Sequence, residues 1–497
     1  MAKVAKRKVP RCMSTQHPDN VSTPFFSNSS VIEGEAEVKE AYFVYSHLNC
    51  EEQMWDSEGK DVDNFVVRKL LSEYPRFFSE KVLGKDVFLT LRVPNPDVEK
   101  NEGKILLEAL ESIPRSFDSA KTFYGPRLDD GTAPVFEVII PMTTDPAQVN
   151  RVWSYYKNFV VGKGSKSIAE GDVSVSEWVG GFNPQEINVI PLVENQESME
   201  RIDFIVGGFL KGKNIERQRV FLARSDPALN YGSLPAVLLV KNALQKLAIL
   251  EEKESVELLP IIGTGSAPFR GNFKPSTTGI FTREYPSIQT FTVQSAFKYD
   301  YPPEEVRKGI DFLLETKRGK PLPVDEEKSG GIISRVSAEY ASQVQELAPF
   351  INKISAFVPK RRKRHLHIGL FGYSRSVTGI SLPRAISFCA SLYSIGIPPE
   401  LLGLSALKPK DFEYLDGAYK SFRQDVADAA RFFNAGTLEH FPSLKGKIAG
   451  VLENFEFEID EEHLHASSQI MSDFSKNNTG KITEEIEKAA WIRKFLG

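Results

Sequence analysis

The chain has 497 residues, of which 41% are hydrophobic and 26% are charged, so it has ample apolar material for a large core. Its formal net charge at pH 7 is −4. This charge gives no positive field for nucleic acid or an anionic membrane as a partner, and it makes small-molecule chemistry the default expectation.

The N-terminal region and the cysteines indicate the cellular compartment of the protein. Residues 2–11 are basic, and we predict that residues 1–11 form a disordered tail. Cys12, Cys50 and Cys389 are far apart and show no C-x-x-C spacing, which indicates a reducing compartment. The sequence has no secretory signal and no run of 18 apolar residues, so we expect a cytoplasmic protein without a membrane segment.

The first motif places His17 between a hydroxyl and amide cluster and a Pro-Asp turn, within residues 13–20. Imidazole titrates near pH ~6.5, and the following proline restricts His17 to extended backbone. Both properties favour a histidine aimed into a site, although X-Pro-Asp-Asn is also ordinary turn chemistry. We interpret His17 as a candidate catalytic residue.

Short apolar runs bounded by polar turns recur along the chain and are typical of buried parallel strands. Residues 46–71 come before these runs and are predicted to be largely helical. Helical patterns follow several of the runs, and residues 233–251 are the clearest example. Residues 397–494 are also predicted to be largely helical. The predicted strands are 87–91, 135–140, 187–192, 220–222, 258–262 and 366–371.

The alternation of strand and helix predicts a parallel sheet with crossover helices. Charged or hydrogen-bonding residues follow many of the predicted strands, which is how a (β/α)8 barrel forms its active-site rim. We therefore predict an α/β fold, a TIM (β/α)8 barrel with additional helices packed around it, as one domain over residues 1–497. A doubly wound open sheet is the alternative, but neither a G-x-G-x-x-G fingerprint nor a P-loop opens a helix.

Carboxylates follow two of the predicted strands. Glu194 comes after strand 187–192, and Asp226 comes after strand 220–222. Mg²⁺ typically takes one or two protein carboxylates and leaves its other positions to water and substrate oxygens. We predict that Glu194 and Asp226 are metal ligands. The alternative is a pair of surface acids, with Asp226 capping a helix before Pro227.

A loop of small residues, 263–272, follows strand 258–262 and ends near Arg270. Backbone amides freed by glycine can hold phosphate oxygens, and a guanidinium adds bidentate donors. The loop therefore predicts an anionic phosphate ligand with Arg270 as a catalytic residue, although such loops also serve as tight connections. The predicted substrate-binding residues of this loop are Gly263, Thr264, Gly265 and Ser266.

Arginines stand at other strand ends. Arg92 follows strand 87–91, and Arg375 follows strand 366–371, with Arg384 further on. Each arginine could form a structural ion pair. Several arginines beside two carboxylates instead favour a binding site for a multiply charged anion. The basic run 360–365 is instead interpreted as a solvated turn, because no aromatic residue in it could stack on bases.

Residues 13–20, 180–194, 221–232 and 263–273 together resemble the archaeal-type phosphoenolpyruvate carboxylases. The resemblance runs over essentially the whole chain, and several long motifs in the right order are highly specific. It implies a TIM-barrel enzyme that joins phosphoenolpyruvate to bicarbonate with Mg²⁺ or Mn²⁺. The products would be oxaloacetate and inorganic phosphate, formed through carboxyphosphate and an enolate, and the assembly would be a homotetramer.

The resemblance also implies roles for single residues. His17 resembles the catalytic histidine, which would accept a proton from carboxyphosphate or stabilise it. Glu194 and Asp226 resemble the metal ligands, and Arg270 resembles the second arginine of the glycine-rich phosphate loop. Further substrate arginines are similar in placement to Arg92, Arg375 and Arg384.

The chain departs from the longer enzymes of this family at two places. Thr264 lies near the position of their first loop arginine, and Leu229 stands where they have a lysine after the metal aspartate. We expect Arg224, just before that aspartate, to supply the missing positive charge and to bind substrate.

Two other classes of function are open. Another metal-dependent barrel enzyme acting on phosphoenolpyruvate or pyruvate, such as a kinase or a carbon–carbon lyase, would use the same carboxylates but would turn over without bicarbonate. A non-catalytic anion-binding or RNA-binding protein would bind nucleic acid in a salt-dependent way and release no phosphate. The near-neutral charge argues against that class.

Overall fold

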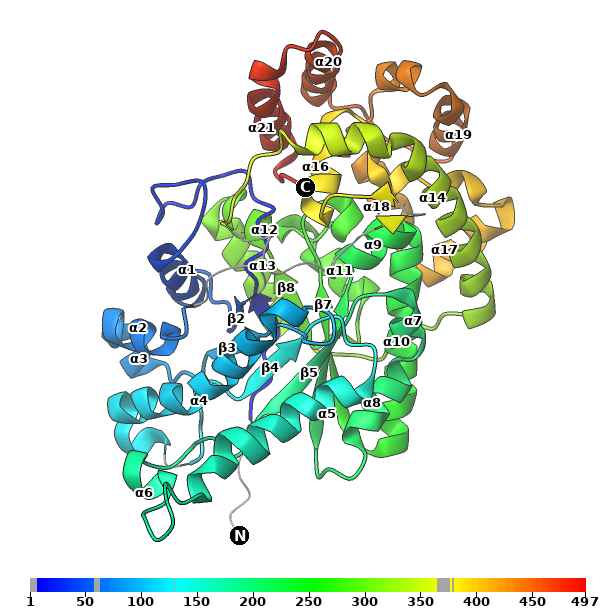
Figure 1. Cartoon of the computed structure of the whole chain (residues 1–497). Coiled ribbons are helices and arrows are strands. Elements are labelled where there is room, and N and C mark those ends of the chain that lie inside the picture. Colours follow the sequence, from blue (N-terminus) through cyan, green and yellow to red (C-terminus); the bar gives the residue numbers. More distant parts are fainter. Residues whose placement is uncertain (1–6, 58–62, 129, 364–375, 378–379) are drawn as a thin grey trace.

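The structure is a computed structural model that describes residues 7–57, 63–128, 130–363, 376–377 and 380–497. Eight parallel strands form a closed barrel in which each strand pairs with the next and β1 pairs with β8 (Figure 1). The strands are β1 (Cys12–Ser14), β2 (Glu52–Asp56), β3 (Phe88–Arg92), β4 (Glu137–Ile140), β5 (Asn188–Val193), β6 (Arg217–Ala223), β7 (Glu257–Gly263) and β8 (Thr290–Val293).

Helices between consecutive strands cover the outside of the barrel. They are α1 (Glu35–Ser46), α2 (Val66–Glu73), α3 (Pro75–Glu80), α4 (Gly103–Tyr124), α5 (Pro146–Tyr155), α6 (Val175–Val179), α7 (Gln196–Glu200), α8 (Ile202–Leu210), α9 (Ser225–Tyr231), α10 (Ser233–Glu254) and α11 (Thr278–Glu284). After β8 the chain continues through α12 (Ser295–Tyr299) and α13 (Pro303–Glu315).

A second set of helices lies over the end of the barrel where the strands finish, at the top of Figure 1. It begins with the long α14 and includes a two-stranded sheet of β9 and β10. Its elements are α14 (Glu326–Ser355), β9 (Ser376–Val377), β10 (Ile380–Ser381), α16 (Ala385–Ser394), α17 (Pro409–Ala418), α18 (Phe422–Ala430), α19 (Pro442–Leu452), α20 (Glu461–Ser475) and α21 (Ile482–Arg493).

The barrel interior has an apolar layer and a charged layer. Side chains alternate along a strand, so every second residue points inward. On β6, Phe221 belongs to an inner cluster with Met13, Met54 and other residues, and Arg219 lies two residues before it. The Arg219 guanidinium bonds to Glu52 on β2 at 2.7 Å and to Glu137 on β4 at 2.9 Å. A cation at the lower end of the interior is thus neutralised by acids from across the barrel.

The predicted TIM (β/α)8 barrel with additional helices is confirmed. The predicted strands from 87–91 to 258–262 correspond to β3 through β7, and the helix predicted over residues 233–251 is α10. Residues 397–494 are largely helical, as predicted. The strand predicted at 366–371 lies outside the described residues, and the barrel closes without it. That residues 1–497 form one domain stays a prediction.

The prediction of helix over residues 46–71 is wrong in part, because β2 lies inside that segment. The inward-facing Glu52 of β2 serves the charged layer, so the strand shows no apolar run. β1 and β8 were also missed. They have three and four residues, which is too short for a periodic signal.

The disordered tail predicted for residues 1–11 does not reach Arg11. Residues 1–6 lie outside the described part of the chain. The Arg11 side chain donates hydrogen bonds to the carbonyl oxygens of Ile288 and Gln289 at 2.7 and 3.0 Å. Arg7 stacks over the Phe136 ring, with its guanidinium carbon 3.8 Å from the ring centre. These cations are held against the barrel.

The helix α10 is long and apolar enough, by length and composition, to cross a membrane. However, 72% of its most apolar stretch is buried within the protein, and the helix contacts α8, α9 and α14. Its apolar character is accounted for by this packing between the barrel and the second set of helices.

Candidate active site

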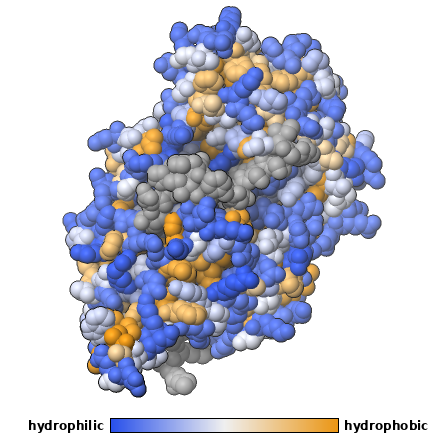
Figure 2. All heavy atoms as spheres, viewed as in Figure 1, coloured by the Kyte–Doolittle hydropathy of each residue, from blue (hydrophilic) through white to orange (hydrophobic). Residues whose placement is uncertain are grey.

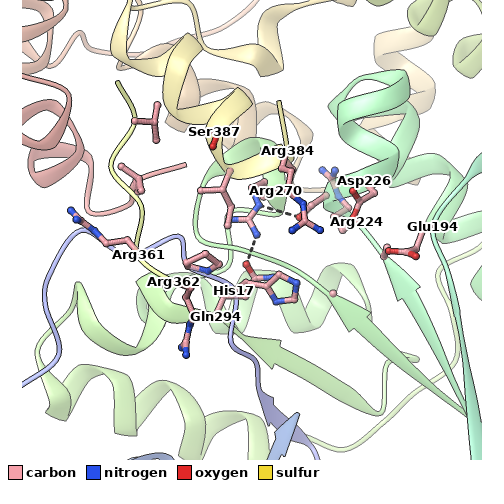
Figure 3. A pocket seen from close by; sticks show the side chains of 18 of the residues that line it. His17, Glu194, Arg224, Asp226, Arg270, Gln294, Arg361, Arg362, Arg384 and Ser387 are labelled. Carbon is pink, nitrogen blue, oxygen red and sulfur yellow. Dashed lines mark hydrogen bonds between the residues drawn. The ribbon is translucent and has the colours of Figure 1, made fainter. Parts of the chain in front are cut away.

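A cavity of about 450 Å³ opens where the barrel strands end, beneath the second set of helices. Its lining comes from several barrel strands, from the segment after α14 and from the start of α16. Figure 3 shows arginine, carboxylate and imidazole side chains pointing into this space. The predicted site residues that line it are His17, Arg92, Glu194, Arg224, Asp226, Gly263, Arg270 and Arg384.

His17 lies just beyond the end of β1. Its carbonyl oxygen accepts the amides of Asp19 at 3.1 Å and Ser295 at 3.3 Å, which fixes the turn after the ring. Its Nδ1 lies 2.9 Å from the Thr15 hydroxyl. The turn expected from Pro-Asp-Asn is therefore present, and the imidazole still faces the cavity. An ordinary turn and a histidine that points into a site, the two interpretations of residues 13–20, are therefore compatible.

Arg270 is held on several sides and is 1% exposed. Its Nη1 donates to Asp19 Oδ2 at 3.1 Å and to the Gly497 carbonyl at 2.7 Å. Its Nη2 donates to the Gln294 side-chain oxygen, and its Nε donates to Ser225 Oγ at 3.2 Å. Arg270 is therefore fixed in one orientation before any ligand arrives.

Asp19 is the buried counter-ion of Arg270. Burial raises the pKa of Asp19, while the Arg270 charge and the Ala296 amide oppose that rise. The Ala296 amide donates to Asp19 Oδ1 at 2.7 Å. The motif that carries His17 thus also orients the arginine of a distant loop.

Most of the backbone of the glycine-rich loop holds Arg270 in place and does not line the cavity. The amide of Gly265 donates to the Arg270 carbonyl at 2.9 Å, and the amide of Thr264 donates to Thr292 Oγ1 at 3.0 Å. A Cβ atom on Gly265 would lie 2.9 Å from the Arg270 guanidinium carbon, so only glycine leaves room there. Of the predicted substrate-binding residues of this loop, Gly263 lines the cavity, and Thr264, Gly265 and Ser266 do not.

Arg224 brings a second buried cation to the cavity and is also 1% exposed. It donates to the Phe269 carbonyl at 3.3 Å and to Ser233 Oγ at 3.2 Å. Among the described residues, its Nε has no hydrogen-bond partner and no carboxylate forms an ion pair with it. Nearby Glu400 is buried and accepts the Tyr393 hydroxyl. Burial raises the pKa of Glu400 to about 8, so this acid is mostly protonated at neutral pH, whereas the buried Asp425, whose pKa rises only to about 6, is mostly ionised and interacts with the Arg224 charge.

The two predicted metal ligands end adjacent strands. In the register of β5 and β6, Val193 is level with Leu222, which brings Glu194 beside the start of α9. Asp226 lies in the first turn of α9 and is not its N-cap residue. One carboxylate oxygen of Glu194 accepts the Met142 amide at 2.6 Å. Figure 3 shows Glu194 and Asp226 on the same side of the pocket.

These carboxylates suit a hard divalent cation. No group of three or more histidine, cysteine, aspartate or glutamate side chains that could hold a metal occurs in the described ranges. Glu194 and Asp226 both reach the cavity, so a cation there would take its remaining oxygens from water or substrate. That pattern is typical of Mg²⁺ and not of zinc or copper.

The other predicted arginines differ in their surroundings. Arg92 forms a bidentate ion pair with Asp56, with distances of 2.8 and 2.9 Å. Asp56 ends the missed strand β2, so this partner of Arg92 was not expected. Arg384 precedes α16 and lines the cavity. Arg375 lies outside the described residues.

The solvated turn predicted at 360–365 is wrong for two of its residues. Arg361 and Arg362 are buried, and both line the cavity. Arg362 Nη2 donates to both carboxylate oxygens of Glu40, at 2.7 and 2.6 Å, and Arg361 Nη2 donates to Glu487 at 2.8 Å. A basic run alone does not reveal the acids on distant helices that pair with it. Residues 364–365 lie outside the described part of the chain.

Gln294 is a further site residue that sequence reasoning missed. It follows β8 and connects the cavity wall to Arg270. Active-site residues of a barrel follow the ends of its strands. This rule would have identified Gln294 if β8 had been recognised as a strand.

A family described as phosphoenolpyruvate carboxylase matches residues 9–497. A phosphoenolpyruvate carboxylase of Methanothermobacter thermautotrophicus is 53% identical to the chain, with 99% of this chain and all of the relative covered. Those of Methanospirillum hungatei and Pyrococcus furiosus are 50% and 47% identical, with 99% and 98% of this chain and all of each relative covered.

Among solved structures, an HpcH/HpaI aldolase/citrate lyase family protein from Burkholderia cenocepacia is similar to part of the chain. The match covers 62% of this chain and 94% of that protein, at 14% identity and a TM-score of 0.34.

Proposed function

Because the chain belongs to the phosphoenolpyruvate carboxylase family, we propose that it joins phosphoenolpyruvate to bicarbonate to give oxaloacetate and inorganic phosphate. The observation that carries this proposal is the meeting of His17, Arg270, Glu194 and Asp226 in one cavity. These residues come from distant parts of the chain, and each was a candidate for one step of that reaction. The cavity also has ample room for a three-carbon phosphate ester.

The arginines are suited to the first step. The phosphoryl group leaves the enol oxygen of phosphoenolpyruvate for a bicarbonate oxygen, which forms carboxyphosphate and the enolate of pyruvate. Negative charge spreads over the phosphoryl oxygens, and oriented donors stabilise it most when they need not reorganise. Arg270 is already fixed by its partners, and Arg224 has a buried Nε that makes no hydrogen bond among the described residues. We place the phosphate between them.

His17 is suited to the second step. Carboxyphosphate breaks its bond between carbon and the bridging oxygen to give CO2 and phosphate, and C3 of the enolate then attacks CO2 to form the new carbon–carbon bond. A proton from water would instead convert the enolate to pyruvate. The ring lies at the cavity wall below the arginines (Figure 3), where it can contact carboxyphosphate. We propose that it directs this intermediate toward decarboxylation.

We propose that Glu194 and Asp226 hold a Mg²⁺ or Mn²⁺ ion. Such an ion supplies positive charge to substrate oxygens when it is bound. The two carboxylates, on adjacent strand ends, would orient it from one side of the cavity. The Met142 amide restrains Glu194 and limits its freedom to turn away.

Replacing Glu194 by glutamine should weaken metal binding. The amide keeps the size of the side chain and can still accept the Met142 amide, but it loses the negative charge that attracts the cation. We expect the Mg²⁺ concentration for half-maximal activity to rise about tenfold or more, because losing one ligand or its orienting contacts commonly has effects of this size. Calorimetric titration with Mn²⁺ tests the same change without turnover. Unchanged metal affinity would mean that the carboxylate is structural.

We also propose a homotetramer in the cytoplasm. The family resemblance supports it, and so do exposed apolar side chains that another subunit could cover. Trp178 on α6 is 70% exposed, and Phe159 in the helical segment after α5 is 56% exposed. Figure 2 shows hydrophobic atoms gathered at this lower corner of the molecule. Light scattering on the purified protein measures the assembly mass directly.

One coupled assay tests the proposed activity. Phosphate release and oxaloacetate formation are followed from phosphoenolpyruvate and Mg²⁺, with and without bicarbonate. We expect equal amounts of both products, and only when bicarbonate is present. Turnover that ignores bicarbonate would instead assign the chain to another reaction of phosphoenolpyruvate, such as that of a kinase or a lyase.

A further inference from the structure

The peptide between Pro141 and Met142, just after the end of β4, connects Glu194 to a buried asparagine. The Met142 amide donates to Glu194 Oε2 at 2.6 Å. The carbonyl oxygen of Pro141, on the other side of the same peptide, accepts the side-chain amide of Asn95 at 2.8 Å. Asn95 follows β3, is 1% exposed and has no role in the reaction outlined above.

The geometry of a peptide links these two hydrogen bonds. A peptide group is planar, and in the trans form that this one has, its C=O and N–H bonds point in opposite directions. A donor that holds the Pro141 carbonyl oxygen therefore also sets the direction of the Met142 amide. Rotation of this peptide would break both hydrogen bonds, and it would turn a carbonyl oxygen toward the Glu194 carboxylate.

The backbone of Met142 is in an unfavourable conformation. Its φ angle is 51°, in the left-handed region that residues with a side chain rarely adopt. Thr143 fixes the chain on the far side, because its amide donates to the Leu192 carbonyl of β5 at 2.9 Å and its hydroxyl donates to the Ile140 carbonyl at 2.8 Å. Rotation of the preceding peptide would bring the φ angle of Met142 to a negative value, which a methionine prefers. The observed conformation therefore needs a contact that opposes this rotation.

Asn95 is itself fixed by the turn in which it lies. Its side-chain oxygen accepts the Asp97 amide at 3.1 Å, so its NH2 group is the end that faces the carbonyl oxygens of Pro141 and Met142. Its main-chain amide donates to Glu99 Oε2 at 3.0 Å, and its carbonyl oxygen accepts the Glu99 amide at 2.7 Å. The direction of the Asn95 side chain is therefore set by neighbours in the chain and does not depend on a bound metal.

We propose that Asn95 is a positioning residue of the metal site, which holds the peptide after β4 so that the Met142 amide keeps Glu194 turned toward the cavity. Glu194 lines this cavity together with Asp226 (Figure 3). Groups that orient a metal ligand from behind commonly contribute strongly to metal affinity. This inference rests on the proposed function, because it assigns Asn95 to the metal site proposed there.

Asn95→Ser tests the proposal through metal binding. Serine keeps a hydroxyl that can accept the Asp97 amide, but its side chain is too short to reach the Pro141 carbonyl. We expect the Kd for Mn²⁺, measured by calorimetry without substrate, to rise about tenfold, the lower end for loss of an orienting contact. Asn95→Ala should give the same result. Wild-type Mn²⁺ affinity in these variants would overturn the proposal.

The matched control is Asp97→Asn, in the same turn. The Asp97 carboxylate forms an exposed ion pair with Arg151 at 2.7 Å and does not contact the peptide after β4. We expect this variant to keep the Kd for Mn²⁺ within about twofold of wild type. An equal loss of affinity in Asp97→Asn would mean that the turn as a whole affects the site, and the specific role of the Asn95 side chain would be lost.

A second substitution distinguishes positioning from a general loss of stability. Glycine adopts a positive φ angle without the steric cost of a side chain, so Met142→Gly removes the tendency of the peptide to rotate. We expect Met142→Gly, added to Asn95→Ser, to bring the Kd for Mn²⁺ back to within about threefold of wild type. Removing a further side chain would not restore a protein that is merely destabilised. If the double variant binds Mn²⁺ as weakly as Asn95→Ser, Asn95 does not act through this peptide.

Glu194→Gln separates failure of this inference from failure of the proposed metal site. If Glu194→Gln weakens Mn²⁺ binding and Asn95→Ser does not, the metal site stands and Asn95 has no part in it. If neither variant changes the affinity, Glu194 is not a metal ligand, and the proposed metal site fails together with this inference.

Discussion

Replacing Arg270 by alanine is expected to lower kcat for oxaloacetate formation by about 100-fold to 1000-fold. Losing one oriented donor to a developing negative charge commonly has an effect of this size. Arg270 is the most restrained cation of the cavity, with partners on Asp19, Ser225, Gln294 and Gly497. These partners use four of its five N–H donors, so one donor remains for the phosphoryl group, and its orientation is set before substrate binds. Phosphate release and oxaloacetate formation should fall together, because both follow phosphoryl transfer.

The same substitution also removes the partner of a buried acid. Asp19 would remain without its cation, and breaking a buried ion pair commonly destabilises a protein by about 3–5 kcal/mol. The double variant Asp19→Asn with Arg270→Ala removes that charge and serves as the control. We expect it to regain thermal stability while its activity stays low. Recovery of activity in the double variant would show that Arg270 acts only by neutralising Asp19.

Arg270→Lys separates charge from geometry. Lysine keeps the positive charge, but it cannot form the forked bonds that the guanidinium makes with Asp19 and Gln294. We expect it to remain closer to the alanine variant than to wild type, and steady-state kinetics of the three proteins will order them.

Several residues of the site could be predicted because each comes directly after an apolar run in the sequence. Glu194 follows the apolar run that ends β5, and Arg224 and Asp226 follow the apolar run that ends β6, so the ends of these strands were visible. Parallel strands in one barrel end at the same rim, and the convergence of these residues on one cavity then follows from topology. The assignment of the reaction came from family resemblance, since strand ends alone do not distinguish a carboxylase from a kinase.

Other features could not be predicted, and the reasons are physical. β2 carries Glu52 into the charged layer, so its sequence does not look like a buried strand, and its terminal Asp56 was hidden with it. Arg361 and Arg362 look like solvated cations until distant acids such as Glu40 are brought beside them. The amides of Thr264 and Gly265 look available for phosphate, but their hydrogen bonds are made within the fold. In each case the deciding partner is remote in sequence.

Replacing His17 by asparagine should separate the two halves of the reaction. Phosphoryl transfer depends on the arginines and the metal carboxylates, so phosphoenolpyruvate should still be consumed slowly when bicarbonate is present. Without the imidazole, carboxyphosphate is no longer directed to CO2 next to the enolate, and the enolate takes a proton to become pyruvate. We expect oxaloacetate to fall by at least about 100-fold, the lower range for loss of a positioned acid or base. Pyruvate should account for most of the phosphate released.

The ratio of oxaloacetate to phosphate distinguishes this outcome from simple inactivation. Arg270→Ala should lower both products and leave their ratio unchanged, whereas His17→Asn should lower the ratio. Asparagine keeps a polar atom that can accept the Thr15 hydroxyl, so the end of β1 need not rearrange when the ring is lost. If His17→Asn lowers both products equally, the ring contributes to phosphoryl transfer or to folding, and the separation of roles proposed for His17 and Arg270 fails. A lowered ratio together with a wild-type unfolding temperature would place His17 after phosphoryl transfer.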